Sequence, residues 1–134
     1  MSAFSKLQAA ICQRSIDQLL KDTAGIMRAV VATTDGFEVV HAPQLAEESG
    51  DGGARLAAMS SSMLALAEAM AKEGNLTECN DVLVDCSDGR MLLLSVPAQE
   101  ARFVLCVAAS SSSTLGHVLA AARLCAQEMS RKLK

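Results

Sequence analysis

The chain has 134 residues, of which 51% are hydrophobic, 20% charged and 2% aromatic, and its formal net charge is −3. This length suits one domain with a proper core, so we expect residues 1–134 to form a single domain, with a first helix at 5–22 and a core at 25–130. The scarcity of aromatic rings and the weakly acidic charge argue against base stacking and phosphate binding, so we expect no nucleic-acid partner.

The first 22 residues alternate apolar and polar side chains without an unbroken apolar stretch. They are therefore predicted to be neither a signal peptide nor a membrane span. Five cysteines are scattered along the chain with no Cys-x-x-Cys pair: Cys12, Cys79, Cys86, Cys106 and Cys125. An odd, dispersed set is typical of reduced thiols, which favours a cytoplasmic location.

Residues 5–21 predict an amphipathic helix, because apolar residues recur there at helical spacing among charged and amide side chains. Two short apolar runs follow, at 29–34 and 37–40, and they meet across Asp35 and Gly36. Asp and Gly tolerate the positive φ that a type I′ turn requires, so this stretch predicts a tight β-hairpin.

Residues 41–54 contain a proline and several glycines, which predicts a loop. Residues 55–73 predict a second helix, with Gly74 and Asn75 as its carboxyl-terminal stop. The large apolar side chains of this helix fall on one stripe: Leu56, Met59, Met63, Leu66 and Met70.

Residues 81–86, 90–96 and 102–109 predict three consecutive antiparallel strands, the last two joined by a turn at 98–100. The serine-rich stretch 110–114 supplies the amino-terminal cap of a third helix, which runs to the end of the chain.

Both alternating sets of side chains are apolar in 90–96 and in 102–109, so helices must cover both faces of the sheet. The predicted fold is therefore an α/β (α+β) protein: a three-layer α/β/α sandwich with a five-stranded, mainly antiparallel sheet. The predicted order is α-β-β-α-β-β-β-α. The first and third helices are expected to share one face, with the second helix on the other.

No stretch has the spacing of a phosphate-binding nucleotide loop. The glycine-rich stretch 50–53 follows two glutamates and contains an aspartate, which favours a plain loop over an anion cradle. His41 and His117 are the only histidines, too few for a zinc site without cysteine help. We expect no metal, no cofactor and no catalytic residue.

Cys106 lies within an apolar strand, where thiolate formation is disfavoured, so we expect an inert core thiol. Cys79 and Cys86 flank an edge strand and are more open, but neither has an evident base beside it. A thiol-dependent enzyme is therefore the third alternative, testable by replacing both cysteines with serine. The expected answer is that the protein is not an enzyme.

Small residues line the side of the second helix away from the large apolar stripe. They are Ala57, Ser61 and Ala65, with Glu68 on the same side and Leu64 interrupting them. Two interpretations stay open: a solvated face of good helix formers, or a surface that lets a helix of a second chain approach closely.

The order of these elements resembles the roadblock (dynein light-chain) family in its bacterial and archaeal branch. The matching stretches are MRAVVATTDGFEVVHA (27–42), LAAMSSSMLALAEAMAKEGNL (56–76), DVLVDCSDGRMLLLSV (81–96) and FVLCVAASSSSTLGHVLAAARL (103–124). Asp-Gly at residues 35–36, Asp-Gly again at 88–89 and Thr-Leu-Gly at 114–116 lie where that family has them.

The resemblance implies an α/β/α sandwich that forms a homodimer, in which the strand 81–86 pairs with its copy and the two second helices lie side by side. A heterodimer with a paralogue stays open. The family regulates or scaffolds small Ras-like GTPases, commonly through the face bearing the second helices. The implied dimer and partner interface comprises Ala57, Ser61, Leu64, Ala65, Glu68, Lys72, Val82, Leu83 and Val84. Because Arg55 is the only arginine in that helix, we expect rearrangement of the GTPase's own residues rather than an arginine finger.

Pairing of residues 81–86 across a two-fold axis places the axis at a residue. An axis at Leu83 would set Asp81 against Asp85 of the partner subunit, a destabilising like-charge pair. We therefore expect the axis at Val82 or Val84.

The alternative function is a small-ligand sensor built on a five-stranded antiparallel sheet. A sensor needs a cavity with a few placed polar groups, whereas these strands are filled with apolar side chains. Stabilisation by a metabolite in a thermal-shift screen would favour the sensor.

Overall fold

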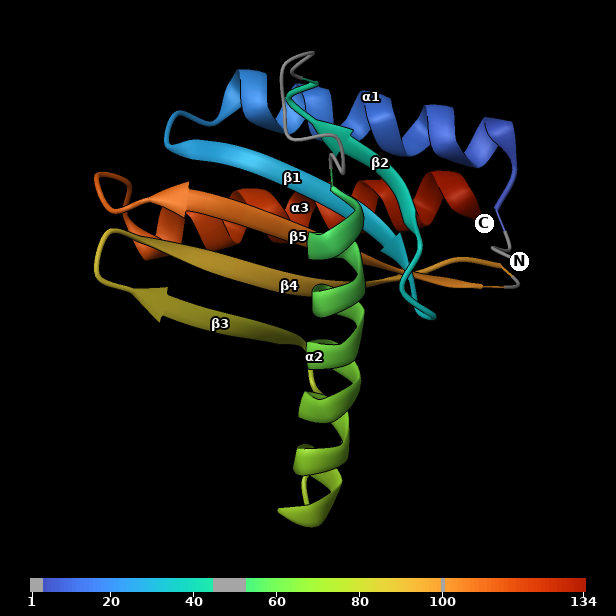
Figure 1. The fold of residues 1–134 in the computed structure, drawn as a ribbon, viewed down its shortest axis with the longest axis vertical. Helices are drawn as coiled ribbons and strands as arrows, with labels where there is room; N and C mark the ends of the chain where they lie inside the picture. The colour runs from blue at the N-terminus through green and yellow to red at the C-terminus, as the bar shows by residue number, and fades with distance from the viewer. Residues whose placement is uncertain (1–3, 45–52, 100) are drawn as a thin grey trace.

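The computed structural model describes residues 4–44, 53–99 and 101–134, and its strands form one sheet between helices (Figure 1). The elements are α1 (Lys6–Asp22), β1 (Ile26–Thr33), β2 (Glu38–Ala42), α2 (Ala54–Glu73), β3 (Asp81–Cys86), β4 (Gly89–Pro97), β5 (Arg102–Ser110) and α3 (Leu115–Leu133). The sheet order is β2-β1-β5-β4-β3, and every neighbouring pair is antiparallel. The predicted fold class and element order are confirmed.

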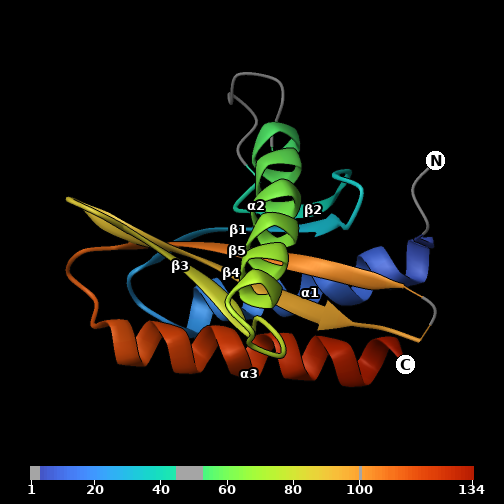
Figure 2. The same cartoon turned by 90° about the horizontal axis from the view of Figure 1, so that it is seen from below.

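The two faces of the sheet carry separate hydrophobic cores. Helices α1 and α3 cover one face, and α2 crosses the other (Figure 2). Along β4, Leu92 and Leu94 belong to the core beneath α1 and α3, whereas Leu93 belongs to the core beneath α2. Leu105 and Cys106 alternate in the same way along β5. This alternation explains why both side-chain sets of these strands are apolar, and it confirms the expected placement of the helices.

Local signals begin and end the helices where the sequence predicts. Ser5 and Gln8 form a capping box at the start of α1, each side chain bonding the other residue's backbone N–H. The Thr114 hydroxyl accepts the corresponding bond at the start of α3. Helix α2 ends just before Asn75, whose φ of 63° turns the chain away from the helix axis.

The hairpin between β1 and β2 has a different turn from the predicted type I′. Only Gly36 has a positive φ, 97°, and Asp35 does not. The Gly36 N–H donates to the Thr33 carbonyl at 3.0 Å, and the Phe37 N–H donates to the Thr33 hydroxyl at 3.0 Å. The Thr33 N–H donates to the Phe37 carbonyl at 2.8 Å, so three residues separate the closing pair, and one of them is a left-handed glycine. The Thr33 hydroxyl also donates to the Asp35 carboxylate.

Helix α2 runs across the strands, and its carboxyl-terminal turns extend past the edge strand β3 (Figure 1). No helix within the described ranges combines the length and the apolar content needed to cross a membrane.

Three sequence predictions fall wholly or partly on residues that the structure does not describe. The loop 41–54 and the glycine-rich stretch 50–53 include residues between 45 and 52, and the turn 98–100 includes residue 100.

Candidate functional site

Helix α2 faces the sheet with the side opposite to the one expected. Ala57, Ser60, Ser61 and Leu64 are buried beneath it, and Leu64 is only 1% exposed. Side chains buried within one chain cannot supply contact area to another. The prediction that Ala57, Ser61 and Leu64 face a partner is therefore wrong, because these side chains face the sheet of their own chain.

Small side chains at this crossing let the helix lie close to the strands. The Ser61 hydroxyl donates to the Thr33 carbonyl of β1 at 2.6 Å and to the Ala57 carbonyl at 3.0 Å. The Ser60 hydroxyl donates to the Leu56 carbonyl at 2.7 Å. These bonds satisfy the buried hydroxyl groups, so the polar residues are compatible with a core position.

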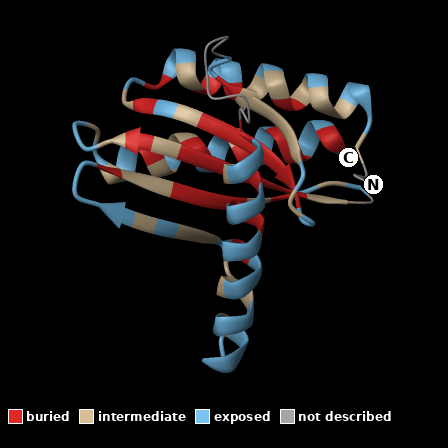
Figure 3. Ribbon diagram, viewed as in Figure 1, coloured by how far each residue is buried: buried red, intermediate tan, exposed pale blue. Residues whose placement is uncertain are grey.

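Much of α2 is exposed (Figure 3), and its side opposite the buried one carries large apolar side chains, which we call the α2 stripe. Its members are Met59 (57% exposed), Met63 (44%), Leu66 (62%) and Met70 (65%). Leu56, which the sequence analysis grouped with them, is half-buried and packs on the core beneath α2. Four adjacent large apolar side chains on one helix are an unusual surface for a chain that acts alone, and such patches mark interaction sites.

A strip of small, exposed side chains lies beside the α2 stripe. It consists of Ala58, Ser62, Ala65 and Ala69. Of these, Ala65 alone was among the residues predicted for the interface. The spacing i, i+4, i+7, i+11 would have joined the four residues on one side of a helix, so the signal was present in the sequence.

Glu68 is engaged within the chain. Arg102, at the start of β5, donates through Nη1 and Nη2 to the two carboxylate oxygens of Glu68, each at 2.9 Å. This two-bond contact joins the carboxyl-terminal half of α2 to the sheet. Lys72, by contrast, is exposed.

Strand β3 forms one edge of the sheet, as expected. Val82 and Val84 point to the α2 side and are half-buried, because they lie opposite Met91 and Leu93 of β4. Leu83 points to the α1 and α3 side and is 46% exposed. Among the described residues, the outward-facing backbone groups of this short, partly apolar strand are therefore not paired with another strand.

Both aspartates of β3 have a cation within their own chain. Arg123 of α3 contacts Asp81, with 2.8 Å between Nε and Oδ2. Arg90 of β4 contacts Asp85, with 3.6 Å between Nε and Oδ1. The like-charge reasoning that placed a two-fold axis away from Leu83 assumed two carboxylates without such cations, so its premise is wrong.

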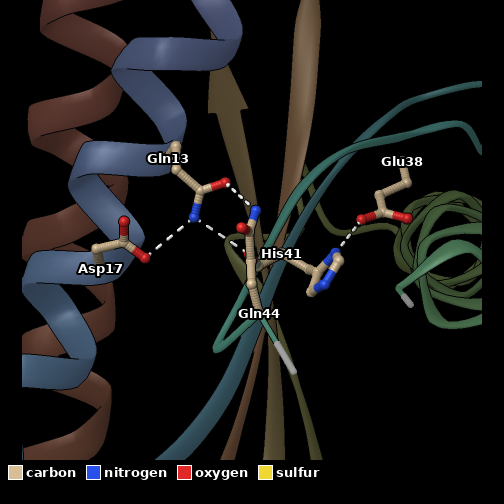
Figure 4. Close-up of polar contacts among 5 residues, drawn as sticks. All are labelled: Gln13, Asp17, Glu38, His41 and Gln44. Carbon is tan, nitrogen blue, oxygen red and sulfur yellow. Dashed lines mark hydrogen bonds and ion pairs between the residues drawn. The ribbon is translucent and has the colours of Figure 1, made fainter. Parts of the chain in front are cut away.

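His41 takes part in a polar cluster between α1 and β2 (Figure 4). Its Nδ1 contacts the Glu38 carboxylate, and its backbone carbonyl accepts a bond from Gln13 Nε2 at 3.1 Å. Gln13 also donates to Asp17 at 3.0 Å and accepts from Gln44 at 3.2 Å. These bonds join α1 to β2, which is a structural role. Within the described residues, no group of His, Cys, Asp or Glu is placed to hold a metal ion.

Three of the thiols have raised pKa values because they are largely shielded from water. Burial raises the pKa of Cys106, and it raises the pKa of Cys12 to about 12 and of Cys125 to about 11. A thiol that stays protonated at neutral pH is a poor nucleophile. Cys86 is exposed and Cys79 is half-buried, and the Cys79 thiol donates to the Asp81 carbonyl oxygen at 3.5 Å.

An open groove of about 380 Å³ lies between α1 and α3. Charged side chains such as Arg14 and Lys132 line it together with apolar ones such as Leu19 and Leu124. It lies between two helices and not within the sheet, and it is not enclosed. A sensor needs an enclosed, mainly apolar cavity, so this groove does not favour the sensor alternative.

Comparison with solved structures shows which fold this is. The gliding protein MglB from Thermus thermophilus superposes with a TM-score of 0.79 at 14% identity, covering 97% of this chain and 93% of that one. Myxococcus xanthus MglB gives 0.80 at 16% identity, covering 98% and 93%. A Roadblock/LC7 domain from Streptomyces avermitilis gives 0.71 at 17% identity, covering 87% and 92%. At such identities the similarity establishes a shared fold.

No curated protein matches the sequence. The family model of the Roadblock/LC7 domain matches residues 13–109, which is more than half of the chain. That span contains the hairpin, α2, β3 and β4, and all of β5 except its last residue. The chain therefore belongs to the Roadblock/LC7 family.

Proposed function

We propose that this chain is a cytoplasmic, non-enzymatic regulator or scaffold, one Roadblock-type domain that forms a homodimer. In this proposal the dimer binds a small Ras-like GTPase and modulates its nucleotide cycle or its localisation. The exposed α2 stripe beside the open edge of β3 is the observation that carries the proposal. The resemblance to roadblock proteins supplies the partner class.

The α2 stripe is apolar enough to drive association. Fully burying a Met or Leu side chain contributes about 1.5–3 kcal/mol, and these four are each roughly half exposed. Covering the stripe would then contribute on the order of 4 kcal/mol per subunit, before the entropic cost of association. The strip of Ala58, Ser62, Ala65 and Ala69 would allow a second helix to approach closely beside it.

The GTPase would bind across the paired α2 helices. Members of the family that the sequence resembles regulate or scaffold Ras-like GTPases through this face. Arg55, in the first turn of α2, is the only arginine of that helix, so the regulator would act by ordering the GTPase's own residues. Glu68 would serve as an anchor of α2 on the sheet, and Lys72 would remain available to the partner.

Replacing Leu66 with Glu should dissociate the homodimer. Two carboxylates would enter a contact that excludes water, and we expect the dissociation constant to rise at least roughly hundredfold. Sedimentation equilibrium measures this directly. Leu124→Glu is the matched control, because Leu124 is 58% exposed on α3, away from the stripe, and should leave the dimer intact. A dimer unaffected by Leu66→Glu, or a monomeric wild type, would contradict the proposed interface.

Affinity capture tests the partner class. The wild-type chain should retain a small GTPase from extracts of its native cells, and more of it in one nucleotide state than in the other when the extract is loaded with GTP or GDP. The Leu66→Glu chain should retain less, and the Leu124→Glu chain the same amount. If the dimeric wild type retains no GTPase in either state, the regulatory proposal fails while the dimer stands.

A further inference from the structure

We propose that two copies of this chain join their β3 strands antiparallel with Leu83 on the two-fold axis. In this register Arg123 and Arg90 neutralise the carboxylates that the axis brings together. The inference rests on the proposed homodimer and specifies how its strands are aligned. It reverses the register expected from the sequence, because both aspartates of β3 have cations beside them.

Of the three registers, this one alone pairs all three apolar residues of the strand with apolar residues. With the axis at Leu83, Leu83 meets its own copy and Val82 meets Val84 of the partner subunit. With the axis at Val84, Leu83 would meet Asp85 of the partner subunit, and with the axis at Val82 it would meet Asp81 of the partner subunit. Either alternative sets a carboxylate against an apolar residue that is 46% exposed in the single chain.

The hydrogen-bonding pattern of the edge permits this axis. A two-residue turn closes the β3–β4 hairpin, and the residues next to it, Cys86 and Gly89, are opposite each other. The closing pair of such a hairpin exchanges hydrogen bonds, so even-numbered residues of β3 direct their backbone groups toward β4. The backbone groups of Asp81, Leu83 and Asp85 then point to the open edge. Leu83 and its copy can exchange two bonds across the axis.

The charges at each end of the paired strands sum to zero. Asp81 would lie opposite Asp85 of the partner subunit, which alone would be repulsive. Asp81 is bonded to Arg123 at 2.8 Å, and Asp85 is accompanied by Arg90 at 3.6 Å. Each end therefore holds two carboxylates and two guanidinium groups on the α1 and α3 side of the sheet.

Disulfide trapping identifies the axis. In a Cys79→Ser, Cys86→Ser chain, Val82→Cys and Val84→Cys variants with tags of different size are mixed and exposed to oxidised glutathione. Positions 82 and 84 of the two subunits would form a non-hydrogen-bonded pair with Cα atoms about 4.5 Å apart, within disulfide reach. The expected product is the mixed covalent dimer.

Each other product overturns the inference. A covalent dimer of Val84→Cys alone or Val82→Cys alone places the axis at that residue and leaves the homodimer standing. A non-covalent dimer without any cross-link means that β3 is not the joined edge. A chain that sediments as a monomer removes the proposed homodimer as well.

Arginine replacement tests the charge argument separately. Arg123→Gln should raise the dimer dissociation constant roughly tenfold by exposing two Asp–Asp contacts, and Asp81→Asn added to it should restore most of the affinity. Lys132→Gln makes the same charge change elsewhere on α3 and should have no effect. Thermal unfolding of each variant shows that its fold persists. If the Arg123→Gln chain has the same dimer dissociation constant as the wild type, Arg123 does not have the role assigned to it.

Discussion

Replacing Leu64 with Ala should lower the free energy of unfolding by about 2–5 kcal/mol, whereas Leu66→Ala should change that of the single chain by less than about 0.5 kcal/mol. Leu64 is 1% exposed and packs with Val30, Leu93 and Val104 beneath α2, so its truncation leaves a cavity. Leu66, two residues away, is 62% exposed. Urea denaturation at low protein concentration measures both changes.

The two substitutions should rank in the opposite order in their effect on dimerisation. Leu66→Ala should weaken the dimer and remove the part of the unfolding free energy that increases with protein concentration, because only the folded chain dimerises. Equal stability losses for the two variants would contradict the observed orientation of α2.

Gly89→Ala should destabilise the chain by about 2–3 kcal/mol, lowering the melting temperature by roughly 10 °C. A Cβ at Gly89 would lie 2.5 Å from the backbone carbonyl oxygen of Ala109, which the neighbouring strand holds in place. Strands β4 and β5 would have to separate at this end, weakening the pairing of Gly89 with Ser110.

Gly116→Ala is the control, because it should change stability in the opposite direction. Gly116 lies in the first turn of α3 with open space where its Cβ would be, so alanine should stabilise the chain by roughly 0.5–1 kcal/mol. Calorimetry of both variants compares them under one condition. Similar melting temperatures for the two would show that the close approach of β4 and β5 is relaxed in solution.

Most of the fold could be predicted because its signals are local. Two adjacent apolar strands, 90–96 and 102–109, required cover on both faces, and this requirement alone placed the helices in two layers. Ser5 and Thr114 fixed helix starts within one residue. The predicted type I′ turn between β1 and β2 was wrong, because Gly36 alone of the two turn residues has a positive φ, and the Thr33 hydroxyl bonds to Asp35 within the loop.

The site was harder to predict because helix α2 is apolar on two sides. The general rule sends the larger apolar stripe to the core, but here that stripe is exposed and small residues are buried. The Ser61 hydroxyl can be buried because it donates to the Thr33 carbonyl, which lies 28 residues away in the sequence. The cation on Asp81 comes from Arg123, 42 residues away. Such contacts between residues far apart in the sequence depend on how the helices lie against the sheet. The spacing of apolar residues along the chain does not specify this.

The two edges of the sheet differ, and this difference bears on the size of the proposed assembly. At β2 the His41 carbonyl is bonded to Gln13 of α1, whereas among the described residues no strand lies beyond β3. If both edges accepted strands, copies would add end to end and form an unbounded ribbon. If β3 alone accepts a strand, the proposed homodimer would use both open edges, and association through the sheet would end at two chains.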